Sequence, residues 1–178
     1  MKSSTQVYGK LAVSLHWISL LLILVLAPLG TIMVRLGENP IRANLYRLHA
    51  TIGIVVLLLT LARVLWRAID RDPDPPQGLA GKHLTLFKAV HFLLYVALLS
   101  LTITGLGMLN ATGVGLSLSA LSPELITAEM QPRIGHSLIS KLFIALFFAH
   151  LGGVLLHQVQ KGDILHRMGI GWFQKKVA

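Results

Sequence analysis

The sequence contains no cysteine and few charged residues. The lack of cysteine excludes structural disulfides, thiolate-ligated iron–sulfur clusters, Cys-ligated zinc and the C-x-x-C-H attachment of c-type haem. Charged residues make up 13% of the 178 residues, about half the share in soluble globular proteins. Hydrophobic residues make up 54%, which is more apolar side chain than a soluble domain can hide. The composition therefore favours a membrane protein, and it leaves the eight histidines as the residues for metal or redox chemistry.

Acidic residues are also scarce, with 7 Asp and Glu against 16 Lys and Arg and a net charge of +9. A nucleic-acid-binding protein would gather this charge on one soluble face or helix. Here the positive residues lie between long apolar segments. We therefore expect no nucleic-acid partner and relate the charge to orientation in a lipid membrane.

Four apolar segments predict four transmembrane helices, at about residues 11–34, 48–66, 89–109 and 134–160. Segments of this length can cross a hydrocarbon core of ~30 Å. A cleavable signal peptide is the alternative for the first segment. However, its apolar run exceeds the usual ~7–15 residues, and no small-x-small cleavage site follows before Arg35. We therefore expect the first segment to remain as a helix.

Prolines separate the helices, and no repeat of fixed period divides the chain. Pro73, Pro75 and Pro76 lack backbone N–H groups, so the second helix must end before them. Pro123 and Pro132 flank a weakly structured third connection. We expect residues 1–178 to form one all-α domain, a four-helix up-down-up-down bundle.

The positive-inside rule orients this bundle. The N-terminus, the second connection with its flanks and the C-terminal tail carry Lys2, Lys10, Arg63, Arg67, Arg71, Lys82, Lys88, Lys161, Arg167, Lys175 and Lys176. The opposite ends carry Arg35, Arg42, Arg47, Arg133 and Lys141. Both termini are therefore predicted to lie in the cytoplasm.

Six histidines lie in or at the edge of the predicted helices: His16, His49, His91, His136, His150 and His157. Polar side chains at this depth are costly, so each needs a partner. His136 and His150 are 14 residues apart, which is about 40° short of four turns and about 21 Å along a helix. One helix face thus presents an imidazole near each membrane surface. His83 and His166 lie outside the predicted helices, and we expect them to be solvated.

The depth of each histidine in the membrane predicts which histidines form pairs. Distances from the flanking charged residues match His16 with His150 at the inner end and His49 with His136 at the outer end. Two neutral imidazoles can ligate a six-coordinate haem iron from opposite faces. We therefore predict two non-covalent b-type haems. Metal transport is the alternative use of such histidines, but it normally also requires carboxylates, which the predicted helices lack.

Two glycines and one arginine lie on the helix faces that carry the paired histidines. Gly30 and Gly53 would leave room for a macrocycle, although glycine also serves helix packing in membranes. Arg63 lies on the face of His49 but at the inner end, where it could pair with a haem propionate or bind another ligand.

The sequence resembles the bacterial cytochrome b561 family, which is related to the cytochrome b subunits of formate dehydrogenases and nickel–iron hydrogenases. The resemblance covers nearly the whole chain. It rests on His16-Trp17, Arg47-Leu48-His49 with Gly53, Arg63 with Trp66-Arg67, the proline-rich residues 73–76, His91, His136, His150 and His157. It implies a di-haem protein of the bacterial inner membrane that exchanges electrons with the quinone pool. One type of member resembles a superoxide oxidase, which passes electrons from periplasmic superoxide to ubiquinone.

The residues are compatible with this chemistry. The outer Arg and Lys residues would steer an anion towards the outer haem or simply anchor the interface. His91, His157 and Arg63, with Lys161 nearby, are candidates for quinone binding and proton transfer; support of the inner haem is the alternative. Two functions remain open. The protein is either an oxidoreductase for superoxide, or another small donor, and ubiquinone, or an electron-carrier subunit for a protein partner.

Overall fold

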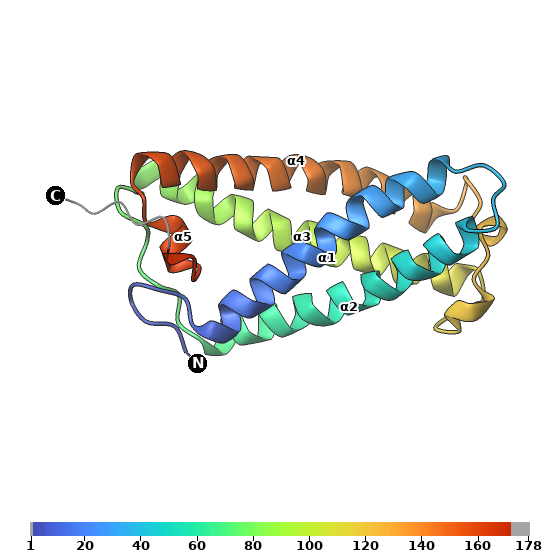
Figure 1. Ribbon diagram of the computed structural model, residues 1–178, viewed down its shortest axis with the longest axis horizontal. Helices are drawn as coiled ribbons and strands as arrows, with labels where there is room; N and C mark the ends of the chain where they lie inside the picture. Colours follow the sequence, from blue (N-terminus) through green and yellow to red (C-terminus); the bar gives the residue numbers. More distant parts are fainter. Residues whose placement is uncertain (1, 172–178) are drawn as a thin grey trace.

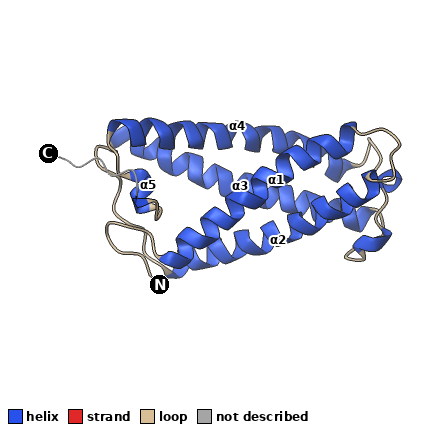
Figure 2. Ribbon diagram, viewed as in Figure 1, coloured by secondary structure: helices blue, strands red, loops and turns tan. Residues whose placement is uncertain are grey.

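Four long helices make up most of the computed structural model, which describes residues 2–171 (Figure 1). They are α1 (Lys10–Arg35), α2 (Arg42–Ile69), α3 (Gly81–Ala111) and α4 (Gln131–Gln160), followed by the short α5 (Ile164–Arg167). Two 3-10 turns, η1 (Leu118–Ala120) and η2 (Pro123–Leu125), lie in the α3–α4 connection. Between residues 2 and 171 the chain has helices and loops without strands (Figure 2). The predicted all-α class is confirmed. Lys175 and Lys176, counted above for orientation, lie outside the described residues.

The long helices run up and down along one axis, so the connections gather at two ends (Figure 1). We call residues 2–9, 70–80 and 161–171 the terminal end, and residues 36–41 and 112–130 the distal end. Helix α1 packs on α2, α2 on α3 and α3 on α4, whereas no Cα atom of α1 or α2 lies within 8 Å of one in α4 over the described range. The predicted four-helix bundle is confirmed, and α4 meets the α1–α2 pair through side chains of a shared core.

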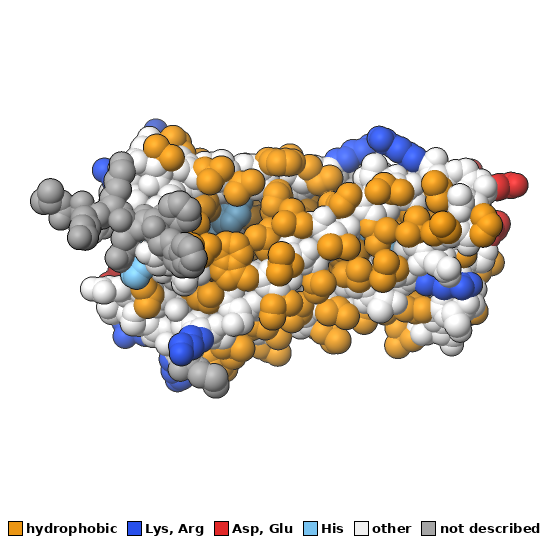
Figure 3. All heavy atoms as spheres, viewed as in Figure 1, with side chains coloured by type: hydrophobic (Ala, Val, Ile, Leu, Met, Phe, Trp, Pro, Cys, Tyr) orange, Lys and Arg blue, Asp and Glu red, His pale blue; other side chains and the backbone are white. Residues whose placement is uncertain are grey.

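The bundle has the surface of a membrane protein. Hydrophobic side chains cover its long side, while Lys and Arg lie towards the two ends (Figure 3). All four long helices are long and apolar enough to cross a membrane, and large apolar side chains such as Leu21, Leu58 and Ile103 are more than half exposed. A groove of about 380 Å³ between α1 and α4 is lined mostly by apolar side chains. Lipid is the solvent that such a surface requires.

The helices extend beyond the predicted apolar segments. Helix α3 begins at Gly81 rather than near residue 89, and α2 begins at Arg42 rather than near residue 48. The added turns carry exposed polar residues such as Lys82 and His83. Hydropathy marks the lipid-embedded part of a helix, whereas the backbone hydrogen bonds continue into the polar interface.

Buried side chains form two clusters along the bundle. Val56, Ala97, Leu98 and Phe143 join α2, α3 and α4 in one cluster. Tyr46, Leu109 and Leu121 form the second, in which Leu121 of the α3–α4 connection is 1% exposed. The distal connection is thus fixed to the bundle by apolar packing.

Asp70 joins the N-terminal segment to the end of α2. Its carboxylate accepts hydrogen bonds from the Ser3 hydroxyl at 2.7 Å, the Ser3 backbone N–H at 3.1 Å and the Trp66 indole N–H at 3.1 Å. The Ser3 hydroxyl is the largest influence in holding the pKa of Asp70 below its ordinary value. Because the folded state binds this proton less tightly, the contact stabilises the fold above pH ~4 and is lost as the pH falls below that range.

We expect Ser3→Ala to lower the thermal unfolding temperature of the detergent-solubilised protein by a few degrees at pH 7. The difference from wild type should shrink at pH 3, because Asp70 of the unfolded state then binds a proton and part of the contact's stabilising effect is lost. A residual difference is expected, because the Ser3 hydroxyl oxygen also accepts from the Gly9 N–H at 2.9 Å. Thermal unfolding followed by circular dichroism at both pH values tests this, and an equal difference at the two values would contradict it.

Candidate functional site

His16 of α1 and His150 of α4 lie side by side towards the terminal end of the bundle. Their ring centroids are 6.4 Å apart and the ring planes are inclined by 62°. His16 lies in the second turn of α1 and His150 towards the end of α4, so antiparallel packing brings them to one depth. The structure therefore places together the two histidines that the sequence pairs at the inner end.

His49 of α2 and His136 of α4 form a second pair towards the distal end. Their centroids are 6.2 Å apart and their ring planes are inclined by 73°. Both lie in the second turn of their helices, which begin at the distal end. Helix α4 thus supplies one histidine to each pair, and the pairs lie at opposite ends of the bundle.

The spacing within each pair fits two axial ligands of one metal ion. A metal–imidazole bond is about 2 Å long, and the nitrogen lies roughly 1.1 Å from the ring centre, so two axial rings have centroids roughly 6.3 Å apart. The observed values are 6.4 and 6.2 Å. Each pair also connects helices whose backbones do not pack directly against each other. A prosthetic group held by either pair would therefore join two helices whose backbones are not in direct contact.

Hydrogen bonds at Nδ1 leave the Nε2 atom of His136 free to bind a metal ion. Its Nδ1 lies 3.0 Å from the Leu101 carbonyl oxygen, which only accepts, and 3.1 Å from the Thr104 hydroxyl. The proton therefore belongs on Nδ1, where it is donated to the carbonyl, and Nε2 keeps a free lone pair. This tautomer is the one that ligates iron through Nε2.

The glycines on the ligand faces have different surroundings. A Cβ on Gly30 would come within 3.0 Å of His49 Cε1, so Gly30 gives room to the His49 ring itself rather than to a more distant group. A Cβ on Gly53 would meet no described atom within 4 Å. The His49 Nδ1 atom is buried and has no hydrogen-bond partner among the described residues. The His49 site thus combines open space beside Gly53 with a polar atom that lacks a partner, as expected for a position that holds a prosthetic group.

Arg63 lies beside the inner pair, at the depth expected from the sequence. Its Nη2 is 3.2 Å from His16 Nδ1, and its guanidinium carbon is 5.1 Å from the centre of the Tyr95 ring. Because arginine only donates, His16 Nδ1 accepts in this arrangement. Ligation through Nε2 instead requires a proton on Nδ1, so Arg63 must then release this contact. Its guanidinium would become available to a carboxylate.

His91 packs directly against the inner pair. Its ring is perpendicular to that of His150 with centroids 4.8 Å apart, and its Nδ1 is 2.7 Å from the Phe87 carbonyl oxygen, to which it donates. Three imidazoles and Arg63 therefore gather towards the terminal end. Within residues 2–171, no group of three His, Asp or Glu side chains is arranged to bind a metal ion.

The other histidines lie at the terminal end. His157 Nε2 donates to Asp163 Oδ1 at 2.8 Å, a partner that the sequence did not indicate. His83 is exposed, as expected. His166 is only partly exposed, contrary to the solvated position predicted for it. The reason is that the α5 segment folds back on the bundle, where the Trp17 indole N–H donates to the Met168 carbonyl at 3.0 Å.

Two of the outer cations support the distal connection. Arg47 Nε donates to the Leu121 carbonyl at 3.0 Å, and Arg133 donates to the Ile126 carbonyl at 3.4 Å. Arg42 lies over the Tyr46 ring at 5.7 Å, and its buried Nε has no hydrogen-bond partner within residues 2–171. Arg47 and Arg133 thus each donate one hydrogen bond to the loop, whereas Arg42 packs on Tyr46.

Comparison with known proteins agrees with this arrangement. The family described as prokaryotic cytochrome b561 matches residues 7–171. The curated protein "Cytochrome b561 homolog 2" of Escherichia coli (strain K12) is 30% identical over 111 residues, which are 62% of this chain and 59% of that relative. The match thus spans less than two thirds of the relative's length. Because the family match includes all four long helices and all four paired histidines, the chain belongs to the prokaryotic cytochrome b561 family of b-type haem membrane electron-transfer proteins.

Proposed function

We propose that this protein transfers electrons across the bacterial inner membrane, from a periplasmic donor at the distal end to ubiquinone at the terminal end. With superoxide as the donor, two superoxide anions, one ubiquinone and two protons become two molecules of oxygen and one ubiquinol. The main support is the presence of two histidine pairs, with centroid distances of 6.4 and 6.2 Å, at opposite ends of one bundle.

His16 and His150 would hold the inner haem, and His49 and His136 the outer one. Each bound iron supplies reversible one-electron transfer between its ferric and ferrous states. The chain contributes the ligand tautomers, the apolar surroundings and the spacing. His136 and His150 are about 21 Å apart along α4, so the pairs together cover much of the hydrocarbon layer.

The distal end has the charge to attract an anionic donor. Arg35 and Lys141 are exposed, and Arg42 retains its buried unpartnered Nε. Glu124 is a nearby acid, and hydrogen bonding from Ser122 together with the charge of Arg42 lowers its pKa. A predominantly positive rim raises the local concentration and the association rate of an anion such as superoxide.

Side chains at the terminal end support the assignment of quinone reduction to this end. His157 lies about 10 Å along α4 from His150, and exposed apolar side chains of Leu156 and Val159 flank it. A lipid-soluble quinone can therefore approach His157 from the bilayer. We assign proton transfer to His157, and we assign Arg63 and His91, which contact the inner pair, to supporting the inner haem and the quinone site.

Stopped-flow spectroscopy tests this function. We expect superoxide to reduce the haems of the purified protein at a rate close to the diffusion limit, and ubiquinone to reoxidise them. Reduction that is no faster than in a control with superoxide dismutase would exclude superoxide as the donor.

An electron-carrier subunit is the second candidate, and one feature of the distal end favours it. Leu116 and Leu125, in the α3–α4 connection, are 75% and 41% exposed. Such apolar side chains suit a protein partner better than a small anion. In that case a reduced periplasmic protein, and not superoxide, would reduce the haems in the same experiment.

Arg42 should contribute measurably to anion attraction. We expect Arg42→Gln to lower the rate constant for reduction by superoxide several-fold and to weaken its dependence on ionic strength. Lys82→Gln, which removes the same charge from an exposed position at the terminal end, is the control. Equal losses in both variants would indicate an effect of net charge and contradict a local role of Arg42.

A further inference from the structure

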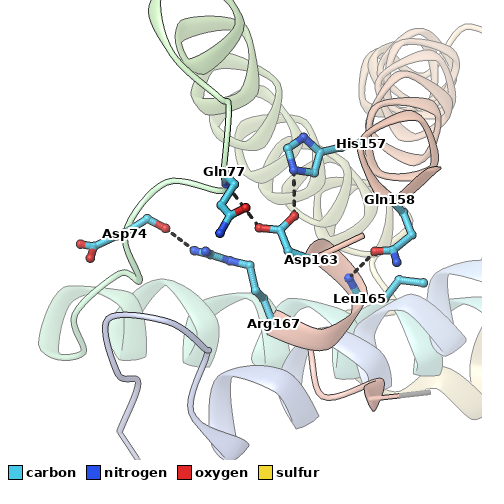
Figure 4. Close-up of polar contacts among 7 residues, drawn as sticks. All are labelled: Asp74, Gln77, His157, Gln158, Asp163, Leu165 and Arg167. Atoms are coloured by element: carbon cyan, nitrogen blue, oxygen red, sulfur yellow. Dashed lines mark hydrogen bonds and ion pairs between the residues drawn. The ribbon is translucent and has the colours of Figure 1, made fainter. Parts of the chain in front are cut away.

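The turn after α4 brings a carboxylate back to His157. Helix α4 ends at Gln160, and the next glycine, Gly162, has φ +80°. Only glycine adopts this left-handed conformation readily, and it commonly reverses the chain after a helix. The reversal places Asp163 Oδ1 2.8 Å from His157 Nε2 (Figure 4).

Asp163 does not use its carboxylate in the usual way for its position. It precedes α5 at the N-cap, where an aspartate normally accepts from the first N–H groups of its own helix. Its side chain makes no such bond. Instead Oδ1 accepts from His157 and Oδ2 accepts from the Gln77 backbone N–H at 3.3 Å. The carboxylate therefore bonds to His157 instead of capping the first turn of α5.

Neighbouring contacts hold this arrangement in place. The Leu165 N–H donates to Gln158 Oε1 at 3.0 Å, which fixes the start of α5 against the end of α4. Arg167 donates to the Asp74 carbonyl of the α2–α3 connection (Figure 4). The Tyr8 N–H donates to the Arg167 carbonyl at 3.1 Å. Three segments of the terminal end thus support the position of Asp163.

The pair is partly shielded from water, which strengthens its electrostatic interaction. The side chains of His157 and Asp163 are 13% and 24% exposed. Attraction between such groups is screened less than that of a surface ion pair. Other charged or titratable groups on the segments packed here are Tyr8, Asp74, Lys82, His83, Lys88, His91, Lys161, His166 and Arg167. Among the described residues, Asp163 is the carboxylate that forms an ion pair with His157.

We propose that Asp163 is a positioning residue for quinone reduction, which orients the His157 ring and places a carboxylate against its Nε2 atom. This inference rests on the proposed function. The Asp163 carboxylate accepts a hydrogen bond from the Nε2–H group of His157. The Nδ1 atom lies on the other side of the ring and faces away from the carboxylate. The imidazolium gives its Nδ1 proton to a quinone oxygen as an electron arrives from the donor, and water on that side of the membrane replaces it. Two such transfers complete the reduction to ubiquinol.

Asp163→Asn tests the proposal because the amide can still accept from Nε2 but carries no charge. Protein prereduced with dithionite is mixed with a short-chain ubiquinone, and haem oxidation is followed between pH 5.5 and 9. For Asp163→Asn we expect wild-type rates at the acidic end and at least a tenfold loss at the alkaline end. Asp163→Glu should recover much of the rate, and adding Asp163→Asn to His157→Gln should cause little further loss.

Asp74→Asn is the matched control, since Asp74 contacts Arg167 through its backbone carbonyl rather than its carboxylate. A wild-type profile for Asp163→Asn beside a defective His157→Gln would overturn the role of Asp163 alone. A loss equal at all pH values would indicate a structural role and overturn it as well. If ubiquinone fails to oxidise the wild-type haems, the proposed function fails and this inference fails with it.

Discussion

Replacing His136 with alanine is expected to halve the haem content of the purified protein, from two haems per chain to one. In the proposed arrangement His136 would supply one of the two nitrogen ligands of the outer haem, and its Nδ1 is already bonded in the tautomer that ligation would require. Without it, a haem there keeps only His49, since no other histidine ring contacts that pair among the described residues. A pyridine haemochrome assay, normalised to protein, measures the change.

The four single replacements should fall into two classes. His49→Ala and His136→Ala should leave the same remaining haem, with the same absorption maximum and midpoint potential. His16→Ala and His150→Ala should leave the other. The exposed His83 is the control, and His83→Ala should retain both haems. If His136→Ala instead matched His16→Ala, the pairing would be wrong. Circular dichroism separates selective haem loss from unfolding of α4.

The histidine pairing was accessible from the sequence because helical geometry and depth are both encoded locally. Fourteen residues bring His136 and His150 to nearly one face of α4, and flanking charges mark how deep each histidine lies. The antiparallel order of four helices then leaves few partners at each depth. The same reasoning placed Arg63 beside the inner pair, where it contacts His16.

Contacts made by turns and connections were not accessible in this way. Asp163 becomes a partner of His157 only because Gly162 reverses the chain and Gln77 accommodates the second carboxylate oxygen. The hydropathy pattern predicts neither the chain reversal nor the contact with Gln77. Likewise Arg47 and Arg133 appeared as free outer charges, but the folded α3–α4 connection presents carbonyls to both. Gly162, two residues after the end of α4, was the signal for the turn in the sequence, although a glycine does not identify the partner.

The Gly30 result also refines how the glycines serve the site. The sequence suggests that both Gly30 and Gly53 make room for a macrocycle. In the structure a Cβ at Gly30 would press on the His49 ring at 3.0 Å, whereas at Gly53 it would enter open space. Gly30 therefore acts on the position of a ligand, while Gly53 borders the volume beside it. The two glycines should respond differently to substitution.

Gly30→Val is expected to abolish binding of the outer haem and to leave the inner haem in place. Its Cβ alone meets His49 Cε1 at a distance that real Cβ atoms rarely show, and the two methyl groups add further crowding. The His49 ring must shift, and a metal–imidazole bond of about 2 Å tolerates a change of only about 0.2 Å. We expect outer-haem occupancy below a tenth of wild type, measured by haemochrome assay and redox titration.

Two further variants show where the space is needed. Gly152→Val makes the same change on α4 at an exposed position with nothing within 4 Å, and it should keep both haems. Gly53→Ala meets no described atom and replaces a helical glycine, so it should keep or raise the stability of the haem-free protein. If Gly53→Ala nevertheless loses the outer haem, the space beside Gly53 holds the macrocycle itself. Full haem content in Gly30→Val would show that His49 can move without cost, and would argue against its role as an axial ligand.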